Sequence, residues 1–254
     1  MRRPRIGVWY GEPASPTSTG WFLYLMEQRL GLTVSRIRPG DLKTTRLNDL
    51  DVLVLPDSDP LGSAYQERLG EAGTEQLGRW IEAGGVFVGI GGGAALAARP
   101  EIEWTSSRPV TQPQEEPSGE GRATEVGAGS EQFPGVKDLP ASTPGAIARA
   151  VLDDHHFLTV GYGSWVAVPV VSRVSFTPSS TGRNVATFDE AERLRLSGFM
   201  WDETREAMAA QAYLVTERHG QGKVILFAGD PAFRGYWPNL YRLLLNAVLL
   251  APSL

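Results

Sequence analysis

The chain has 254 residues, of which 42% are hydrophobic, and a formal net charge of −5 at pH 7. A chain of this length buries roughly 70–75% of its extended surface, so one large core is feasible, while the acidic balance argues against a nucleic-acid-binding protein. There is no cysteine, which excludes disulfides, thiolate metal sites and cysteine nucleophiles.

No apolar stretch approaches the ~20 residues that a membrane-spanning helix needs, so we expect no membrane span. The apolar run at 6–10, which follows the arginine-rich residues 2–5, is too short for the apolar part of a signal peptide. We therefore expect either a cytoplasmic protein or a domain cut from a longer secreted or periplasmic one.

Strand-like and helix-like patterns alternate over the first hundred residues. Short apolar runs bounded by glycine or proline predict buried strands at 5–10, 51–56 and 86–90, and an alternating pattern predicts an edge or near-edge strand at 33–38. Apolar residues at helical spacing predict helices over 21–30 and 66–83, and a further helix begins at 94–98. The alternation predicts an α/β fold with a mainly parallel central sheet and right-handed crossovers.

The second half of the chain has a different pattern. Residues 100–144 are rich in Pro, Gly, Ser and Glu, which predicts a long, partly flexible surface excursion within one domain that spans 1–254. Additional strands are expected at 147–152, 166–171, 184–188, 209–218 and 223–228, and a closing helix over 240–250.

The glycine-rich run at 84–96 carries the most information about function. Within it, Gly89-Ile90-Gly91-Gly92-Gly93 lies between a predicted strand and a predicted helix. A sharp turn of this kind holds one residue in a strained conformation and lifts its side chain above the carboxyl edge of the sheet. Two plainer readings are that the glycines only permit close packing, or that the helix N-terminus binds a phosphate.

The turn resembles that of class I glutamine amidotransferases, in which a cysteine follows the Gly-Ile dipeptide. Gly91 stands in the place of that nucleophile, so the resemblance implies a vestigial elbow at which no thioester can form. In the family, a later strand leads into His-Pro-Glu, which supplies the base; here Asp230-Pro231-Ala232 matches it. Asp230 is thus a vestigial base position or, alternatively, a turn residue that caps the next helix.

A more distinctive resemblance lies in the Asp-Pro-Ala-Phe-Arg-Gly-Tyr-Trp run at 230–237, together with 153–162 and 196–201. These segments are similar to the amidotransferase-like domain at the C-terminus of certain bacterial zinc carboxypeptidases of the M14 family. The resemblance implies a flavodoxin-like three-layer sandwich and a separate peptidase domain as partner.

The zinc of such a peptidase needs His-x-x-Glu and a distant second histidine. The chain has three histidines, none of which is followed by Glu at that spacing: His155, His156 and His219. We therefore expect no metal site and no cofactor in this chain. A transition-metal site at His155-His156 is a lesser alternative.

Several other residues are candidates for a binding crevice. Glu12 follows the first strand, and in α/β sheets ligands bind at the carboxyl ends of the strands. Trp201, Tyr236 and Trp237 fall near expected strand ends or loops, where they would form stacking platforms, although core filling is the plainer reading.

Three aspartates, Asp57, Asp59 and Asp202, would form a carboxylate cluster for acid–base chemistry if the fold brought them together. Solvated turn residues explain them equally well. A serine nucleophile is not expected, because it would need a histidine partner.

Three functions follow from these observations. The first is a non-catalytic accessory or interaction domain associated with an M14-type metallocarboxypeptidase or with a second copy of itself. The second is a small-molecule hydrolase that uses carboxylates such as Glu12 or Asp230; two buried carboxylates converging in a cleft would favour it. The third is a sugar- or peptide-binding module.

Overall fold

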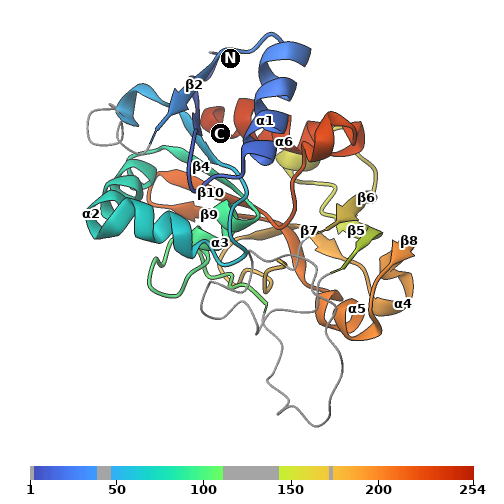
Figure 1. Cartoon of the computed structure of the whole chain (residues 1–254). Coiled ribbons are helices and arrows are strands. Elements are labelled where there is room, and N and C mark those ends of the chain that lie inside the picture. The colour runs from blue at the N-terminus through green and yellow to red at the C-terminus, as the bar shows by residue number, and fades with distance from the viewer. Residues whose placement is uncertain (1–2, 39–46, 111–142, 172–173) are drawn as a thin grey trace.

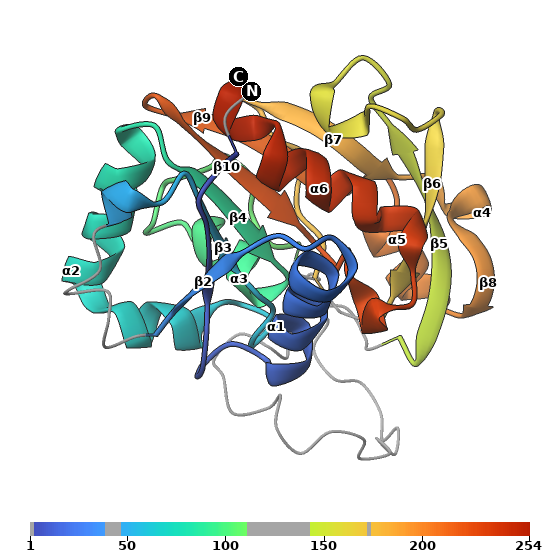
Figure 2. The same cartoon turned by 90° about the horizontal axis from the view of Figure 1, so that it is seen from above.

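The computed structural model describes residues 3–38, 47–110, 143–171 and 174–254 (Figure 1). Its strands form one mixed sheet in the order β2-β1-β3-β4-β10-β9-β7-β5-β6, and β8 pairs with β5 beside this path. Helices cover both faces of this sheet, which gives the three layers of the expected α/β sandwich (Figures 1 and 2).

The first half of the sheet is parallel. Its strands are β2 (Val34–Ile37), β1 (Ile6–Trp9), β3 (Val52–Leu55), β4 (Val86–Ile90) and β10 (Gly222–Phe227). Every residue of β1, β3 and β4 is buried, as their unbroken apolar sequences predict for strands covered on both faces. The carboxyl ends of all five strands therefore meet at one edge.

The second half of the sheet is antiparallel. Its strands are β9 (Ala212–His219), β7 (Arg183–Phe188), β5 (Gly145–Leu152), β6 (Trp165–Val170) and β8 (Arg195–Phe199). Gly220 adopts φ +61° in the β9–β10 hairpin turn, where the glycines predicted such a turn.

The main helices are α1 (Pro16–Leu23), α2 (Ser63–Glu82), α3 (Gly92–Ala97) and α6 (Tyr241–Leu249), with short helices α4 (Ala191–Leu194) and α5 (Asp202–Met208). In Figures 1 and 2, α1 and α6 lie on one face of the parallel strands, and α2 and α3 lie on the other. Within the described ranges, no helix combines the length and the apolar character that crossing a bilayer requires.

The α/β fold with a parallel central sheet and extra strands is confirmed, but some boundaries differ from the prediction. The helix expected at 21–30 already begins at Pro16, because Ser15 caps it through a hydrogen bond from the Ser18 amide (3.4 Å) and proline suits the first helical position. The sequence pattern did not predict β8, α4 or α5, which lie in a charged stretch. All five residues of β8 are exposed, so its sequence lacks the alternation of apolar and polar residues that marks a half-buried strand.

The expected excursion at 100–144 is described only up to residue 110 and from residue 143, and the rest of that prediction lies outside the described residues. Its beginning is packed against the sheet. The Trp104 ring meets Phe87 edge-on with centroids 5.4 Å apart. The Glu217 carboxylate on β9 accepts hydrogen bonds from the Thr105 hydroxyl (2.6 Å) and the Ser106 amide (3.0 Å).

Candidate functional site

The glycine-rich turn lies between β4 and α3, at the carboxyl edge of the sheet. Gly91 adopts φ 52° and ψ −116°, a conformation that costs a residue with a side chain about 1–3 kcal/mol. A Cβ atom on Gly93 would lie 2.2 Å from the Leu55 carbonyl oxygen, because α3 packs directly on the end of β3. Close packing and an elbow-like bend are therefore two properties of the same turn.

The carboxylate of Asp57, from the loop after β3, fills the space above this bend. A Cβ atom on Gly91 would lie 2.1 Å from Asp57 Oδ1. The same oxygen accepts hydrogen bonds from the backbone amides of Gly92 (2.7 Å) and Ser58 (2.9 Å). Burial raises the pKa of Asp57, the two amides oppose that rise, and the charge of Asp59 adds to it.

A second carboxylate, Asp230, follows β10 and reaches the same place. Its Oδ2 accepts a hydrogen bond from the Ser18 hydroxyl on α1 (2.5 Å), and its Oδ1 accepts one from the Ala232 amide (2.8 Å). The Asp57 amide donates to the Ser18 oxygen (3.1 Å). Ser18, which is 2% exposed, thus links the loops after β3 and β10.

The Asp230 carboxyl exchanges its proton near neutral pH. Burial raises its pKa to about 7, the hydrogen bonds from Ser18 and Ala232 lower it, and the charge of Asp57 raises it. A carboxyl group that titrates in this range suits general acid–base chemistry. A structural hydrogen-bonding role is compatible with the same geometry, because Oδ1 also caps the turn at 230–232.

These carboxylates open into a small cavity of about 100 Å³. Hydroxyl and carboxyl groups line one part of it and apolar or aromatic groups the rest; the lining residues are Ser15, Thr17, Ser18, Trp21, Asp57, Pro169, Val171, Ala228, Gly229, Asp230 and Phe233. The Trp21 and Phe233 rings meet edge-on with centroids 5.4 Å apart. Among the described lining residues there is no lysine, arginine or histidine.

The residues proposed for the crevice do not line this cavity. Glu12 is exposed on the loop after β1, where its carbonyl accepts a hydrogen bond from the Trp9 indole (3.3 Å). Tyr236 is 74% exposed, and Trp237 is half-buried with its indole N–H on the Ala167 carbonyl (3.0 Å). Trp201 lies at the start of α5 and is 46% exposed.

The three aspartates considered as a cluster do not converge on this cavity, since only Asp57 lines it. Asp59 caps α2 by accepting hydrogen bonds from the amides of Ser63 (2.9 Å) and Ala64 (3.0 Å). Asp202 is 80% exposed and pairs with Arg205 (3.0 Å). Only Asp57 belongs to the site. Within the described part of the chain, no three His, Asp or Glu side chains gather as metal ligands.

The sequence pattern indicated no role for Ser18 and no pairing of Asp57 with Asp230. The order of the elements could have indicated this site, because Ser18, Asp57 and Asp230 each follow a strand of the parallel half: β1, β3 and β10. The carboxyl ends of these strands share one edge, which is where α/β sheets gather functional groups.

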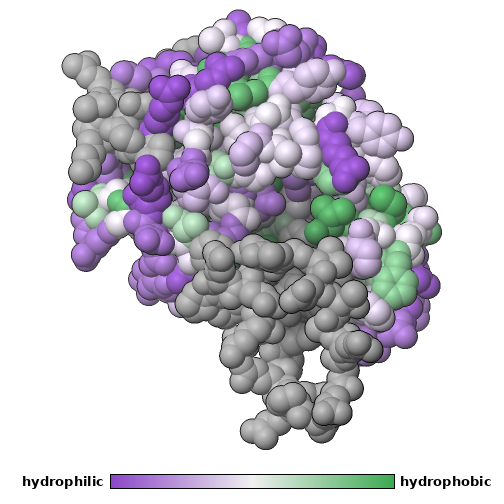
Figure 3. Space-filling model, viewed as in Figure 1, coloured by the Kyte–Doolittle hydropathy of each residue, from purple (hydrophilic) through white to green (hydrophobic). Residues whose placement is uncertain are grey.

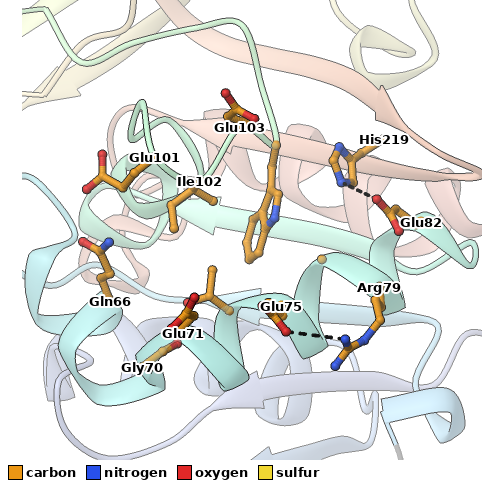
Figure 4. Close-up of a pocket in the computed structure, with 13 residues that line it drawn as sticks. Gln66, Gly70, Glu71, Glu75, Arg79, Glu82, Glu101, Ile102, Glu103 and His219 are labelled. Carbon is orange, nitrogen blue, oxygen red and sulfur yellow. Dashed lines mark hydrogen bonds and ion pairs between the residues drawn. The ribbon is translucent and has the colours of Figure 1, made fainter.

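A larger cavity of about 650 Å³ lies along α2, beside residues 101–104 (Figure 4). Five glutamates line it, Glu71, Glu75 and Glu82 from α2 and Glu101 and Glu103 from the segment beside it. Glu75 pairs with Arg79, and Glu82 with His219, both at 3.5 Å. This surface holds no group comparable to the arrangement of buried Ser18 with the half-buried Asp57 and Asp230, so we place the candidate site at the smaller cavity.

No protein-family model matches the sequence, and no curated protein matches it. Solved structures share its fold. A protein from Thermoplasma acidophilum assigned as a GMP synthase subunit has 12% identity and a TM-score of 0.57, and the match covers 98% of this chain and 96% of that one. A ThuA-like protein from Parabacteroides merdae has 11% identity and a TM-score of 0.58, with coverage of 99% and 91%. The chain therefore has a glutamine amidotransferase-like α/β fold.

The same fold is found within a longer enzyme. An exo-beta-1,4-mannosidase from Opitutaceae bacterium strain TAV5 matches with 12% identity and a TM-score of 0.50. The match covers 97% of this chain but 36% of the mannosidase. Identities this low relate the folds and not the activities.

Proposed function

We propose that this chain is an amidotransferase-like domain that does not hydrolyse glutamine and that acts by packing against a partner. The observation that carries this proposal is the Asp57 carboxylate beside Gly91. Thioester chemistry needs a side-chain nucleophile, which glycine lacks. In elbow-type sites the amide after the nucleophile helps to bind the oxyanion, and here the Gly92 amide is already engaged by Asp57 (2.7 Å).

A glutaminase assay tests the first half of this proposal. We expect the purified chain to release no glutamate from glutamine above the rate of a buffer control, while an active class I amidotransferase in the same assay does. Sustained turnover that survives repurification and falls on substitution of Asp57 or Asp230 would overturn the proposal.

The exposed apolar residues around β8 supply a surface for a partner. Leu196, Phe199 and Trp201 are 43%, 45% and 46% exposed, and the Phe199 and Trp201 rings meet edge-on at 4.6 Å. Figure 3 shows apolar residues on the side of the molecule where β5 and β8 lie in Figure 1. Grouped exposed apolar side chains are typical of interaction surfaces.

The partner proposed is an M14-type peptidase domain, on the resemblance of the run at 230–237, or else a second copy of this chain. The occurrence of the fold as about a third of a mannosidase is in keeping with an accessory role in longer proteins. We expect an M14-type coding region fused to or beside the gene. We also expect the Phe199→Ser/Trp201→Ser variant to lose binding to that domain, or self-association measured by light scattering.

Tyr236→Ser is the matched control for this test, because it removes an exposed aromatic ring that belongs neither to β8 nor to the Phe199–Trp201 pair. Its association should equal that of the wild type. A strictly monomeric chain without a neighbouring peptidase region would contradict the interaction role.

A small-molecule hydrolase that uses carboxylates is the second candidate, because Asp57 and Asp230 converge on one cavity. A screen against ester, amide and glycoside substrates tests it. Hydrolysis that is lost in Asp230→Asn and retained in the exposed-site control Asp202→Asn would establish it, and no turnover on any substrate class counts against it.

A further inference from the structure

We propose that the cavity bounded by Trp21, Asp57 and Asp230 binds the ammonium group of a small organic amine. This inference rests on the chemistry of the cavity and not on the accessory role proposed above.

The two carboxylates have acceptor capacity that the protein leaves unused. Together they offer about eight lone-pair positions. Among the described residues, four donors reach them: Gly92 N and Ser58 N at Asp57, and Ala232 N and the Ser18 hydroxyl at Asp230. An ammonium group brings three donors and would use the free positions.

The pair also lacks a positive partner. Among the ion pairs of the described residues, none involves Asp57 or Asp230, and the groups lining the cavity include no basic side chain. Removing carboxylates from water without a counter-charge is costly, and a bound cation offsets that cost. The raised pKa values of both groups have the same physical origin.

The remaining walls favour an organic cation. The Trp21 ring lies at the cavity, and aromatic faces attract ammonium groups. The guanidinium of Arg234 lies 5.1 Å from the centroid of Phe233, so that this ring already holds a cation. Pro169 and Val171 add apolar surface for a short alkyl chain.

The size of the cavity restricts the ligand further. Its volume of about 100 Å³ is well below the ~300–1,000 Å³ of pockets for drug-sized molecules. It therefore suits an ammonium group with a few carbon atoms, or the amine end of a longer molecule.

Calorimetry and thermal unfolding of the full chain with propylammonium chloride test the proposal, with 1-propanol as the neutral probe of similar shape and sodium chloride to match ionic strength. We expect heat of binding and a raised Tm with propylammonium alone. Asp57→Asn and Asp230→Asn keep the side-chain volume and should each weaken binding about tenfold or more, as expected for loss of a charge-assisted contact.

Asp202→Asn is the matched control, because it removes an exposed carboxylate outside the cavity. It should bind propylammonium as the wild type does, whereas Trp21→Leu should bind several-fold more weakly through loss of the ring contact.

The affinity for propylammonium should also rise as pH increases from about 5 to about 8, because Asp230 loses its proton in this range. The charged group that acts on Asp230 is Asp57, and the Asp230 charge in turn raises the pKa of the nearby Tyr213, which burial already raises well above 10, so the tyrosine stays neutral.

Equal stabilisation by propanol, tighter binding of Mg²⁺ than of the amine, no binding at all, or unchanged binding in both asparagine variants would each overturn the inference. None of these results bears on the glutaminase or partner assays. The amine-binding inference can therefore be wrong while the proposed accessory function holds, and the reverse.

Discussion

Oδ1 of Asp57 lies 2.1 Å from the point that a Cβ atom on Gly91 would occupy. This separation is far inside van der Waals contact, so a side chain at position 91 and the present Asp57 conformation exclude each other. The two positions, which are 34 residues apart in the sequence, are therefore energetically coupled. Glycine is required at position 91 for two reasons: its backbone conformation is strained for other residues, and the Asp57 carboxylate leaves no room for a Cβ atom.

Gly91→Ala should destabilise the wild-type chain by roughly 3 kcal/mol, the sum of backbone strain and overpacking. In an Asp57→Gly background the same substitution should cost only about 1–2 kcal/mol, because the carboxylate no longer obstructs the methyl group. Urea unfolding of the four proteins in this double-mutant cycle measures the difference. Strict additivity would show that Asp57 moves aside freely and that the coupling is absent.

The pH dependence of stability should reveal Asp230. Its folded-state pKa of about 7 lies above the ordinary value of 3.8, so the folded state holds the proton more tightly than the unfolded state. This contribution is fully present below about pH 4 and is lost as pH rises to about 7. Compared with Asp230→Asn, the wild type should lose roughly 2 kcal/mol of unfolding free energy over this interval, after allowance for solvent screening.

Denaturant unfolding at several pH values checks this expectation, with Glu12→Gln as the control because Glu12 is an exposed acid on a neighbouring loop. Parallel pH profiles for the wild type and Asp230→Asn would mean that the aspartate is more accessible to water than the structure indicates.

The sequence predicted those features that depend on local pattern. Unbroken apolar runs and bounding glycines predicted β1, β3 and β4, and the glycine run predicted the turn at Gly91. It did not predict β8, because an exposed edge strand lacks the period-two burial that marks a half-buried strand.

The site depends on contacts between distant segments, which local pattern does not contain. Ser18 and Asp230 are 212 residues apart, and no spacing rule pairs them. Asp230 did match the expected position of a family base. The side chains that shift its pKa, however, are Ser18 on α1 and Asp57 in the loop after β3. Trp201 illustrates the opposite error: core filling was the plainer reading of this residue, yet it is 46% exposed.

Ser18→Ala should raise the pKa of Asp230 above about 7, because the hydroxyl donates a hydrogen bond that stabilises the ionised carboxylate. The variant should also lose roughly 1–3 kcal/mol of stability, since the Asp57 amide loses its acceptor. Carbon-13 NMR titration of the aspartate carboxyl groups measures the pKa directly. Thr17→Ala, which removes an exposed hydroxyl paired with Ser15, is the control, and an equal shift in both variants would contradict a specific role for Ser18.

Glu217 should stabilise the fold through its contacts with residues 105, 106 and 181. Its carboxylate accepts hydrogen bonds from the Thr105 hydroxyl (2.6 Å), from the Ser106 amide and hydroxyl (3.0 and 2.8 Å) and from the Thr181 hydroxyl (2.7 Å). Although burial opposes ionisation, these donors lower the pKa of Glu217 to about 2. The stabilisation is therefore complete above about pH 4.5 and is lost as pH falls towards about 2.

Glu217→Gln should then lower the unfolding free energy by about 2–3 kcal/mol at neutral pH and by progressively less in acid, because the wild type loses the same interactions when it is protonated. Amide hydrogen exchange should show reduced protection at Ser106, whose N–H points at the carboxylate. Glu82→Gln, on the exposed end of α2, should change stability by less than about 0.5 kcal/mol. A Glu217→Gln deficit that is the same at pH 7 and at about pH 3 would mean that the ionised form is not what holds this segment to β9.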